Sequence, residues 1–294
     1  MKMPRRENVN TYASLALVAA CLFLFIAHTI CGDGHGKMFQ YILVSFVTYH
    51  LLYTLLCLFP TCLQPRAYIF TRPGCRTTPA EWRDKVLSTV NAVVQIVGGV
   101  QCYLEWDLFK PESSAWMDGK ERYQQITFVQ YTGCALMGYL IWDLSWMIWH
   151  YNETPDKESI CHHVLFLLVA YYNMYGFYFS KCFAWMACAE ISTIFLNFRW
   201  FLLTLGQKST VAYTANSVLF CLTFLLTRIV VGGWGLYDVW KNKMYWEEGS
   251  FGVHGVVFGL HLIFLMNLFW SQKVVSGFVA GIRALLESDE KKNA

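Results

Sequence analysis

The sequence predicts an all-α integral membrane protein built as a bundle of membrane-spanning helices. Of its 294 residues, 56% are hydrophobic, 17% are aromatic and only 15% are charged. This composition is much more apolar than that of an ordinary soluble domain. The apolar residues fall in runs of roughly 20 with short polar breaks between them, and a helix of that length crosses the hydrocarbon of a bilayer.

Eight runs are candidate spans: residues 12–30, 38–58, 86–104, 126–149, 160–180, 182–205, 211–234 and 251–270. The fifth and sixth runs have almost no loop between them, so we expect a tight turn at Ser180 and Lys181 that joins an antiparallel helical hairpin. Seven spans with one re-entrant segment is the alternative. Gly232, Gly233 and Gly235 predict a turn at the end of the seventh run.

Lysine and arginine are twice as frequent in one set of alternate loops as in the other. Because basic loops stay on the cytosolic side, this bias predicts that both termini are cytosolic. The last residues include Lys291 and Lys292 and resemble a dilysine retrieval signal, which a cytosolic coat reads in order to return cargo to the endoplasmic reticulum. A plain charged tail is the alternative. We therefore predict a multi-pass protein of the endoplasmic-reticulum membrane.

Several function classes find no support in the sequence. It contains no P-loop, no G-x-G-x-x-G after a strand, no H-E-x-x-H and no G-x-S-x-G motif. Its eleven cysteines form no C-x-x-C pair, so we expect neither a metal site nor redox chemistry. The net charge of +3 is explained by the cytosolic loops and predicts no nucleic-acid partner. We expect no cofactor.

Polar side chains inside the apolar runs are the candidate functional residues, because such groups are costly at membrane depth. His162 and His163 are adjacent at the cytosolic end of the fifth run, and Asp143 lies near the same end of the fourth. Arg228 lies deeper in the seventh run and needs a carboxylate or several carbonyl partners. Three other residues have structural explanations, namely snorkelling for Arg199 and a bond to a neighbouring helix for His254 and His261.

Glu190, Thr193 and Asn197 stand at i, i+3 and i+7 of the sixth run and predict a polar stripe on one helix face. Counted from the turn, His162 and Glu190 differ in height by about 15 Å. A long amphipathic ligand could reach both, with its polar head at the histidines. The predicted lipid-binding residues are therefore Asp143, His162, His163, Glu190, Thr193 and Asn197.

Three strings of the chain, Asp143-Leu144, Ile160-Cys161-His162-His163 and residues 190–200, resemble the TLC domain. This domain is shared by translocating-chain-associated membrane proteins, ceramide synthases and the lipofuscinosis-linked cargo receptor of the endoplasmic reticulum. The resemblance is closest to the small TLC domain-containing proteins and covers residues 80–272. It implies a six-helix TLC barrel around a lipid cavity, with one or two extra transmembrane helices in residues 1–79 and a cytosolic tail over residues 273–294.

The resemblance also implies candidate chemistry. Ceramide synthases need two histidines and two aspartates of the corresponding motif to transfer an acyl chain from acyl-CoA to a sphingoid amine. His162, His163 and Glu190 match three of these positions, and are the catalytic candidates if the protein is an acyltransferase. Thr193 stands at the fourth, where a hydroxyl cannot serve as a carboxylate base.

Three functions follow from this pattern. The first is binding or sensing of membrane lipids in lipid homeostasis, without chemistry. The second is a ceramide-synthase-like N-acyltransferase with acyl-CoA as co-substrate and a sphingoid base as acceptor. The third is a cargo or translocation accessory protein, for which the dilysine-like tail is the main support.

Overall fold

The computed structural model describes residues 33–58, 78–106, 128–152, 156–176 and 179–293. Every regular element in these ranges is a helix, which confirms the all-α prediction. The predicted first span, 12–30, lies outside the described residues. In chain order the helices are α2 (Asp33–Leu58), α5 (Pro79–Trp106), α6 (Phe128–Trp149), α7 (Lys157–Gly176), α8 (Ser180–Cys188), α9 (Ile191–Thr204), α10 (Val211–Phe224), the π-helical segment η2 (Leu225–Val231), α11 (Gly232–Lys241), the 3-10 turn η3 (Lys243–Tyr245) and α12 (Phe251–Asn293).

Polar side chains mark the starts of several helices. Thr78 accepts a hydrogen bond from the backbone N–H of Glu81 at 3.1 Å, and Pro79 takes the first position of α5. Asp156 accepts from the backbone N–H of Ser159 at 2.9 Å, so it caps α7. Each of these residues satisfies a backbone donor that has no partner within the helix.

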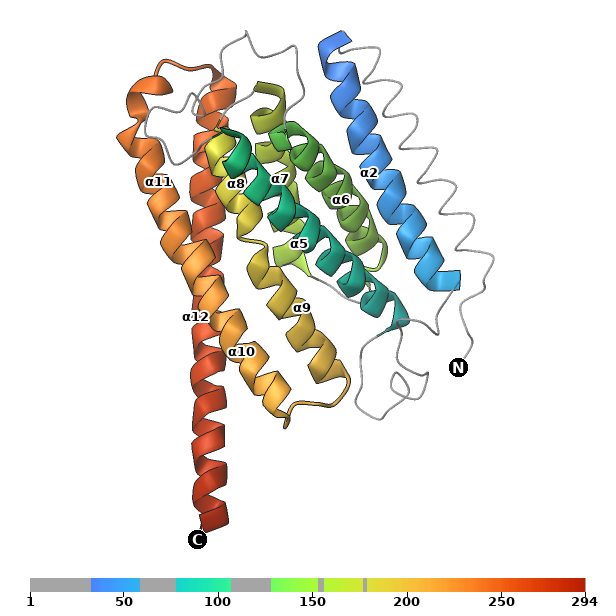
Figure 1. Ribbon diagram of the computed structural model, residues 1–294, viewed down its shortest axis with the longest axis vertical. Coiled ribbons are helices and arrows are strands. Elements are labelled where there is room, and N and C mark those ends of the chain that lie inside the picture. The colour runs from blue at the N-terminus through green and yellow to red at the C-terminus, as the bar shows by residue number, and fades with distance from the viewer. Residues whose placement is uncertain (1–32, 59–77, 107–127, 153–155, 177–178, 294) are drawn as a thin grey trace.

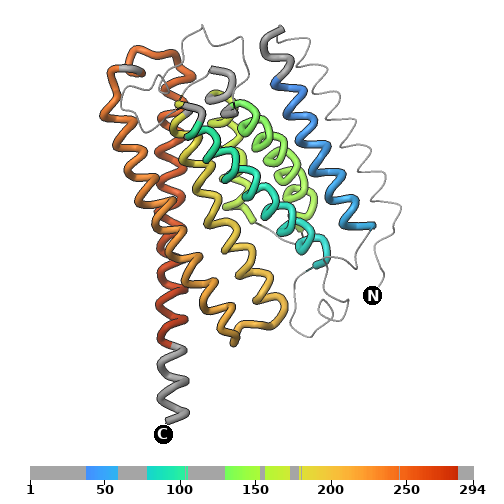
Figure 2. Tube along the Cα trace, viewed as in Figure 1, coloured from blue at the N-terminus to red at the C-terminus, as the bar shows by residue number. Residues whose placement is uncertain are grey.

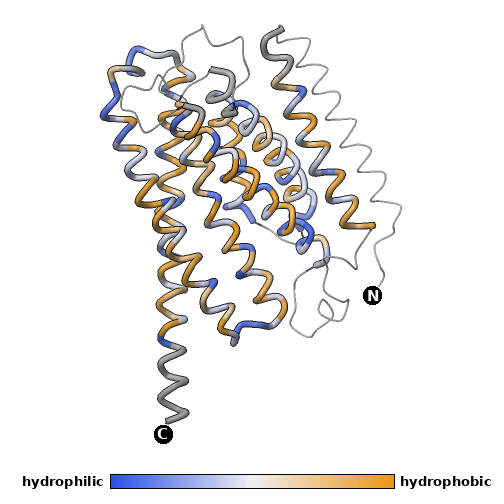
Figure 3. The backbone as a smooth tube through the Cα atoms, viewed as in Figure 1, coloured by the Kyte–Doolittle hydropathy of each residue, from blue (hydrophilic) through white to orange (hydrophobic). Residues whose placement is uncertain are grey.

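Four helical segments of the described chain are long and apolar enough to cross a membrane: Met38–Leu58, Lys181–Thr204, Val211–Lys241 and Phe251–Arg283. The predicted spans 86–104, 126–149 and 160–180 largely coincide with α5, α6 and α7, which are not among these four segments. Figure 3 shows hydrophilic residues within the helices of the bundle as well as at their ends. This distribution places polar groups in the interior of a membrane protein.

Contacts between neighbouring helices join six helical segments into a ring. Figure 1 shows α2 on the outer side of the bundle, next to α6. In the ring, α6 lies between α5 and α7, and α7 contacts α12. Helix α12 contacts the continuous segment α10–η2–α11, and α10 contacts α9. Helix α9 contacts α5, which completes the ring. Helix α8 precedes α9 and packs on α5, while α2 packs outside the ring against α6. This arrangement confirms the six-helix barrel with an additional span outside it.

The structure corrects two details of the fifth and sixth predicted spans. Helix α7 ends at Gly176 and α8 begins at Ser180. Phe179, which directly precedes α8, has a φ of 60°. Ser180 and Lys181 therefore begin a helix and do not form the predicted turn. The α-helical hydrogen bonding of the sixth span is also interrupted, because α8 ends at Cys188 and α9 begins at Ile191. The backbone nevertheless runs on from α8 into α9 (Figure 2). Glu190 lies at this break, so the predicted stripe starts at a helix end.

The predicted turn at the glycine cluster of the seventh span is wrong. The helical segment continues through these glycines to Lys241. A Cβ atom at Gly235 would lie 2.6 Å from the ring of Trp185 on α8. This glycine therefore allows close packing between helices, which a sequence pattern cannot distinguish from a turn signal.

A second glycine sets the contact between α2 and the ring, and gives a test of it. A Cβ atom at Gly138 of α6 would lie 2.6 Å from the backbone oxygen of Ile42 on α2. Because a backbone atom cannot rotate away, we expect Gly138→Ala to destabilise the protein by about 1–3 kcal/mol. Thermal unfolding of the variant and the unmodified protein in detergent measures this loss of stability. Gly277→Ala on α12 is the control, since nothing lies within 4 Å of its Cβ position, and it should be neutral or slightly stabilising. Equal effects of the two substitutions would contradict the close contact.

Candidate functional site

The ring of helices encloses a cavity of about 280 Å³. This volume is close to the lower end of the range of small-molecule sites, roughly 300–1,000 Å³. The structure brings all six predicted lipid-binding residues to its wall: Asp143, His162, His163, Glu190, Thr193 and Asn197. They come from three separate helical segments, so the cavity explains why the sequence places polar groups in several spans.

A further set of polar residues on α5 lines the same cavity and was missed by the sequence analysis. Their spacing of three and four residues puts them on one helix face: Asp84, Lys85, Ser88, Asn91 and Gln95. The opposite face of α5 carries exposed valines, such as Val93 and Val97. The reversed amphipathic pattern, polar inside and apolar outside, was the signal that could have found them.

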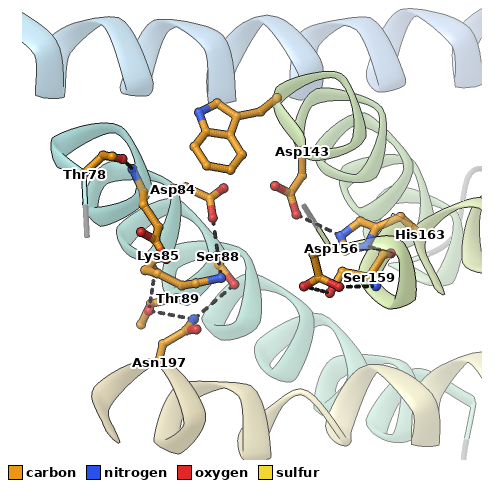
Figure 4. Close-up of polar contacts among 12 residues, drawn as sticks. Thr78, Asp84, Lys85, Ser88, Thr89, Asp143, Asp156, Ser159, His163 and Asn197 are labelled. Carbon is orange, nitrogen blue, oxygen red and sulfur yellow. Dashed lines mark hydrogen bonds and ion pairs between the residues drawn. The ribbon is translucent and has the colours of Figure 1, made fainter. Parts of the chain in front are cut away.

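His163 is held at both ring nitrogens (Figure 4). Its Nε2 lies 2.8 Å from Asp143 Oδ2, and its Nδ1 lies 2.7 Å from the backbone oxygen of Ser159. Tyr139 donates its hydroxyl to the same Asp143 oxygen at 2.9 Å. Since both ring nitrogens face acceptors, the doubly protonated imidazolium satisfies both contacts. His163 is therefore a fixed partner of Asp143.

His162 has a different environment from its neighbour. Its ring packs against Phe166 and Trp270, with centroid separations of 4.2 and 5.1 Å. Its Nδ1 atom is buried and has no hydrogen-bond partner. His162 therefore offers an unused polar atom at the wall of the cavity.

Two buried carboxylates face one another across the gap between α5 and α6 (Figure 4). Asp84 and Asp143 are 5% and 6% exposed and interact with each other, and the Oδ1 atom of each has no other hydrogen-bond partner. The other oxygen of Asp84 lies 3.6 Å from Lys85 Nζ. Two buried carboxylates at close range need a proton or donor groups between them. The pair is thus suited to a ligand head that donates hydrogen bonds.

Arg228 binds Glu190 at the helix break. It donates to Glu190 Oε1 at 3.0 Å, to Ser192 Oγ at 2.9 Å and to Thr193 Oγ1 at 3.1 Å. Of the two kinds of partner predicted for so deep an arginine, a carboxylate or several carbonyl groups, the structure shows the carboxylate. Arg228 lies on the π-helical segment η2, and π-helical segments are frequent at functional sites. Glu190 is therefore paired with an arginine, and Asp143 is the acid that binds a histidine.

Asn197 joins the two sides of the cavity. Its Nδ2 donates to Ser88 Oγ at 3.0 Å and to Thr89 Oγ1 at 3.1 Å, so it fastens α9 to α5 (Figure 4). At 2% exposure its amide is occupied by these contacts. The structure supports a positioning role for it within the wall.

Contacts between α7 and α12 form part of the cavity wall at the histidine end. Trp270, which packs on His162, donates its indole N–H to Glu158 Oε2 at 3.2 Å, and Lys273 donates to both oxygens of Glu158 at 2.8 Å. These hydrogen bonds from Lys273 and Trp270 lower the pKa of the Glu158 carboxyl. The exposed ion pair therefore holds Trp270 over the cavity.

The remaining polar candidates lie away from the cavity. The guanidinium carbon of Arg199 lies 5.3 Å from the ring centroid of Tyr213. His261 accepts a hydrogen bond from the indole of Trp240 at 2.9 Å, and His254 lies 3.1 Å from the backbone oxygen of Ser250. Among the described residues, no group of three or more His, Cys, Asp or Glu side chains is placed to hold a metal ion.

Comparison with known proteins defines the family. A model of the TLC domain matches residues 81–276, which is more than half of the chain. The chain belongs to the TLC domain family. The matched residues run from the first turn of α5 into α12, so they include the segments that form the ring and its cavity, while α2 and the C-terminal part of α12 lie outside the match.

Curated relatives of this TLC protein carry the same domain name. It is 27% identical to TLC domain-containing protein 4-B of Xenopus laevis over 207 residues, which cover 67% of this chain and 74% of that protein. It is 25% identical to human TLC domain-containing protein 4 over 217 residues, covering 72% and 80%. It is 23% identical to TLC domain-containing protein 4 A of Dictyostelium discoideum over 210 residues, covering 68% and 74%.

Proposed function

We propose that this TLC protein binds a membrane lipid in its cavity and acts in lipid homeostasis at the endoplasmic-reticulum membrane. One observation carries the proposal. Among the described residues, five buried side-chain atoms have no hydrogen-bond partner, and four of them belong to residues that line the cavity: Asp84, Gln95, Asp143 and His162. An unsatisfied buried polar group costs about 1–3 kcal/mol, so a polar ligand that satisfies several of them is strongly favoured.

The apolar part of the wall supports an amphipathic ligand. Beside the polar groups, the cavity is lined by aromatic and aliphatic side chains, among them Leu140, Phe166, Phe183, Phe220 and Phe224. Such a wall accepts a hydrocarbon chain, while Asp84, Asp143 and His162 bind a head that donates and accepts hydrogen bonds. A lipid with a small hydrogen-bonding head is the class that fits both features.

Mass spectrometry of lipids retained by the purified protein tests the proposal. We expect a lipid to co-purify in near-stoichiometric amount in mild detergent. His162→Phe keeps an aromatic ring but removes the unpartnered nitrogen, and should lower retention about tenfold, as expected for the loss of one hydrogen bond. Val97→Leu, at a residue that is 64% exposed on the outer face of α5, is the matched control and should retain lipid normally. Equal retention by both variants would contradict lipid binding at this site.

The unpartnered nitrogen of His162 also supports a second candidate function, an N-acyltransferase. A neutral imidazole there can take a proton from an amine as the nitrogen attacks the thioester carbon of acyl-CoA. The carbon–sulfur bond breaks, CoA leaves as the thiol after it accepts a proton, and an amide is formed. Purified protein given acyl-CoA and sphinganine should then release CoA, and the double variant His162→Ala, His163→Ala should abolish the release. Absence of turnover from protein that retains a lipid favours binding alone.

The dilysine-like tail supports the proposed location and, in the third candidate function, cargo transport. Helix α12 extends to Asn293, so Lys291 and Lys292 lie on its last turn. We expect Lys291→Ser with Lys292→Ser to shift the protein from the endoplasmic reticulum towards later compartments, measured by microscopy with compartment markers. Glu287→Gln is the control for a change of tail charge. An unchanged distribution of the lysine variant would contradict a retrieval signal.

The proposed orientation can be tested by glycosylation. Asn152 belongs to the sequon Asn152-Glu153-Thr154, which the charge bias places in the cytosol, where it stays unmodified. Asn152→Gln should therefore leave gel mobility unchanged. Glu248→Asn creates a sequon with Gly249 and Ser250 on the opposite side of the membrane, and should add a glycan that an endoglycosidase removes. Glycosylation at Asn152 would invert the topology and place His162 and His163 at the luminal side.

A further inference from the structure

Gln95 on α5 is a fully buried polar side chain at the end of the cavity far from the histidines. It is 0% exposed and lines the cavity. Its Nε2 contacts Asn91 Oδ1 at 3.4 Å, and Asn91 Oδ1 also accepts from the Tyr49 hydroxyl at 3.2 Å. The remaining polar atom of Gln95, Oε1, has no partner. A residue of the cavity wall therefore carries one buried polar atom without a partner.

Gln95 has an unpartnered atom whichever way the side-chain amides of Gln95 and Asn91 are oriented. If both amides were turned, Asn91 would donate to Gln95, and the Gln95 nitrogen would be the atom without a partner. Either orientation leaves one hydrogen-bonding atom of Gln95 unsatisfied. A hydroxyl group can donate to an oxygen and accept from an N–H group, so it satisfies both cases.

Just beyond Gln95, α5 packs closely against α6 and α8. A Cβ atom at Gly99 would lie 3.0 Å from the backbone oxygen of Ala184 on α8, and one at Gly98 would lie 2.4 Å from the Thr132 side chain on α6. On α5, no residue after Gln95 lines the cavity in the described chain. A group bound at Gln95 is therefore shielded from bulk water. In such a buried place, a polar atom without a hydrogen bond costs free energy.

We infer that Gln95, supported by Asn91, forms a subsite for a hydroxyl group on the hydrocarbon chain of the bound lipid. Gln95 lies eleven residues beyond Asp84 on the same helix, which corresponds to a rise of about 17 Å. The ligand class is thus a single-chain lipid with a hydrogen-bonding head at Asp84, Asp143 and His162 and a hydroxyl well along its chain. The inference rests on the proposed function, because it specifies which lipid the cavity takes.

Binding of two matched probes tests the subsite. The probes are monoacylglycerols with the same eighteen-carbon chain, with or without a hydroxyl at the twelfth carbon, and native mass spectrometry of the full-length protein in detergent measures their affinity. We expect the hydroxylated probe to bind about tenfold more tightly to the unmodified protein. Gln95→Leu should remove this preference while still binding the plain chain. Gln101→Leu, on the same helix but outside the cavity, should keep the preference.

The outcomes separate the subsite from the lipid site. Equal affinity of the two probes for the unmodified protein overturns the subsite and leaves lipid binding intact, since a water molecule would then satisfy Gln95. A preference that persists in Gln95→Leu also overturns it. Binding of neither probe overturns the subsite together with the proposed lipid site. If Gln95→Leu does not fold, Gln95→Ala takes its place with the same expected loss of preference.

Discussion

Replacing Arg228 with methionine is expected to destabilise the protein by about 3 kcal/mol, because it leaves the partly buried Glu190 carboxylate without its partner. The Arg228 side chain is 9% exposed and that of Glu190 is 19% exposed, and they meet at 3.0 Å where α8 gives way to α9. The guanidinium also binds Ser192 and Thr193, so its loss frees three acceptors at once. Thermal unfolding in detergent, followed by fluorescence and size-exclusion chromatography, measures the change.

A double variant separates the charge effect from the loss of packing. Arg228→Met with Glu190→Gln removes both charges and should recover most of the stability lost by Arg228→Met. Lys273→Met, which breaks the exposed pair with Glu158 at 2.8 Å, is the control for an ion pair in contact with solvent and should have little effect. A double variant no more stable than Arg228→Met would show that packing, and not the ion pair, sets the loss.

The second large effect is expected at His163 and not at its neighbour His162. His163→Phe removes the cation that faces Asp143 at 2.8 Å and leaves that carboxylate buried opposite Asp84. We expect a destabilisation of about 3–5 kcal/mol, as for other buried pairs that lose one partner. His162→Phe removes an atom that has no partner, so its unfolding free energy should change by less than about 1 kcal/mol.

The comparison of the two histidines uses unfolding and lipid retention together. His163→Phe should lower the midpoint of thermal unfolding, and Asp143→Asn in the same chain should restore part of it by removing the unpaired charge. His162→Phe should unfold normally but retain less lipid. Equal destabilisation by the two single variants would contradict the assignment of different roles to these adjacent residues.

The ring of helices was implied by the resemblance to the TLC domain, whereas part of the cavity wall could be predicted for a physical reason. Polar side chains at membrane depth are rare, so His162, His163, Asp143 and the stripe from Glu190 to Asn197 stood out against an apolar background. The same argument predicted that Arg228 needs a carboxylate or several carbonyl partners, and the structure shows a carboxylate, that of Glu190. Spacing along one helix could not show which acid faces which base, because that depends on how separate helices pack.

The residues that the sequence analysis missed lie on α5. Asp84, Asn91 and Gln95 repeat with helical spacing, but they alternate with valines in a run whose average composition predicts an ordinary span. Whether these residues line the cavity depends on which face of α5 turns inward. Contacts of α5 with α6, α8 and α9 decide that orientation. The breaks at Phe179 and Glu190 are likewise set by packing, so hydropathy alone misplaced them.

Density in the cavity of the protein purified from its own membrane is the most direct test of lipid binding. A high-resolution cryo-electron microscopy map should show one elongated density in the cavity. Its polar end should lie within hydrogen-bonding distance of Asp84, Asp143 and His162, and its chain should reach Gln95. A cavity that contains only separate water molecules, or one that the facing side chains have filled, would contradict the account.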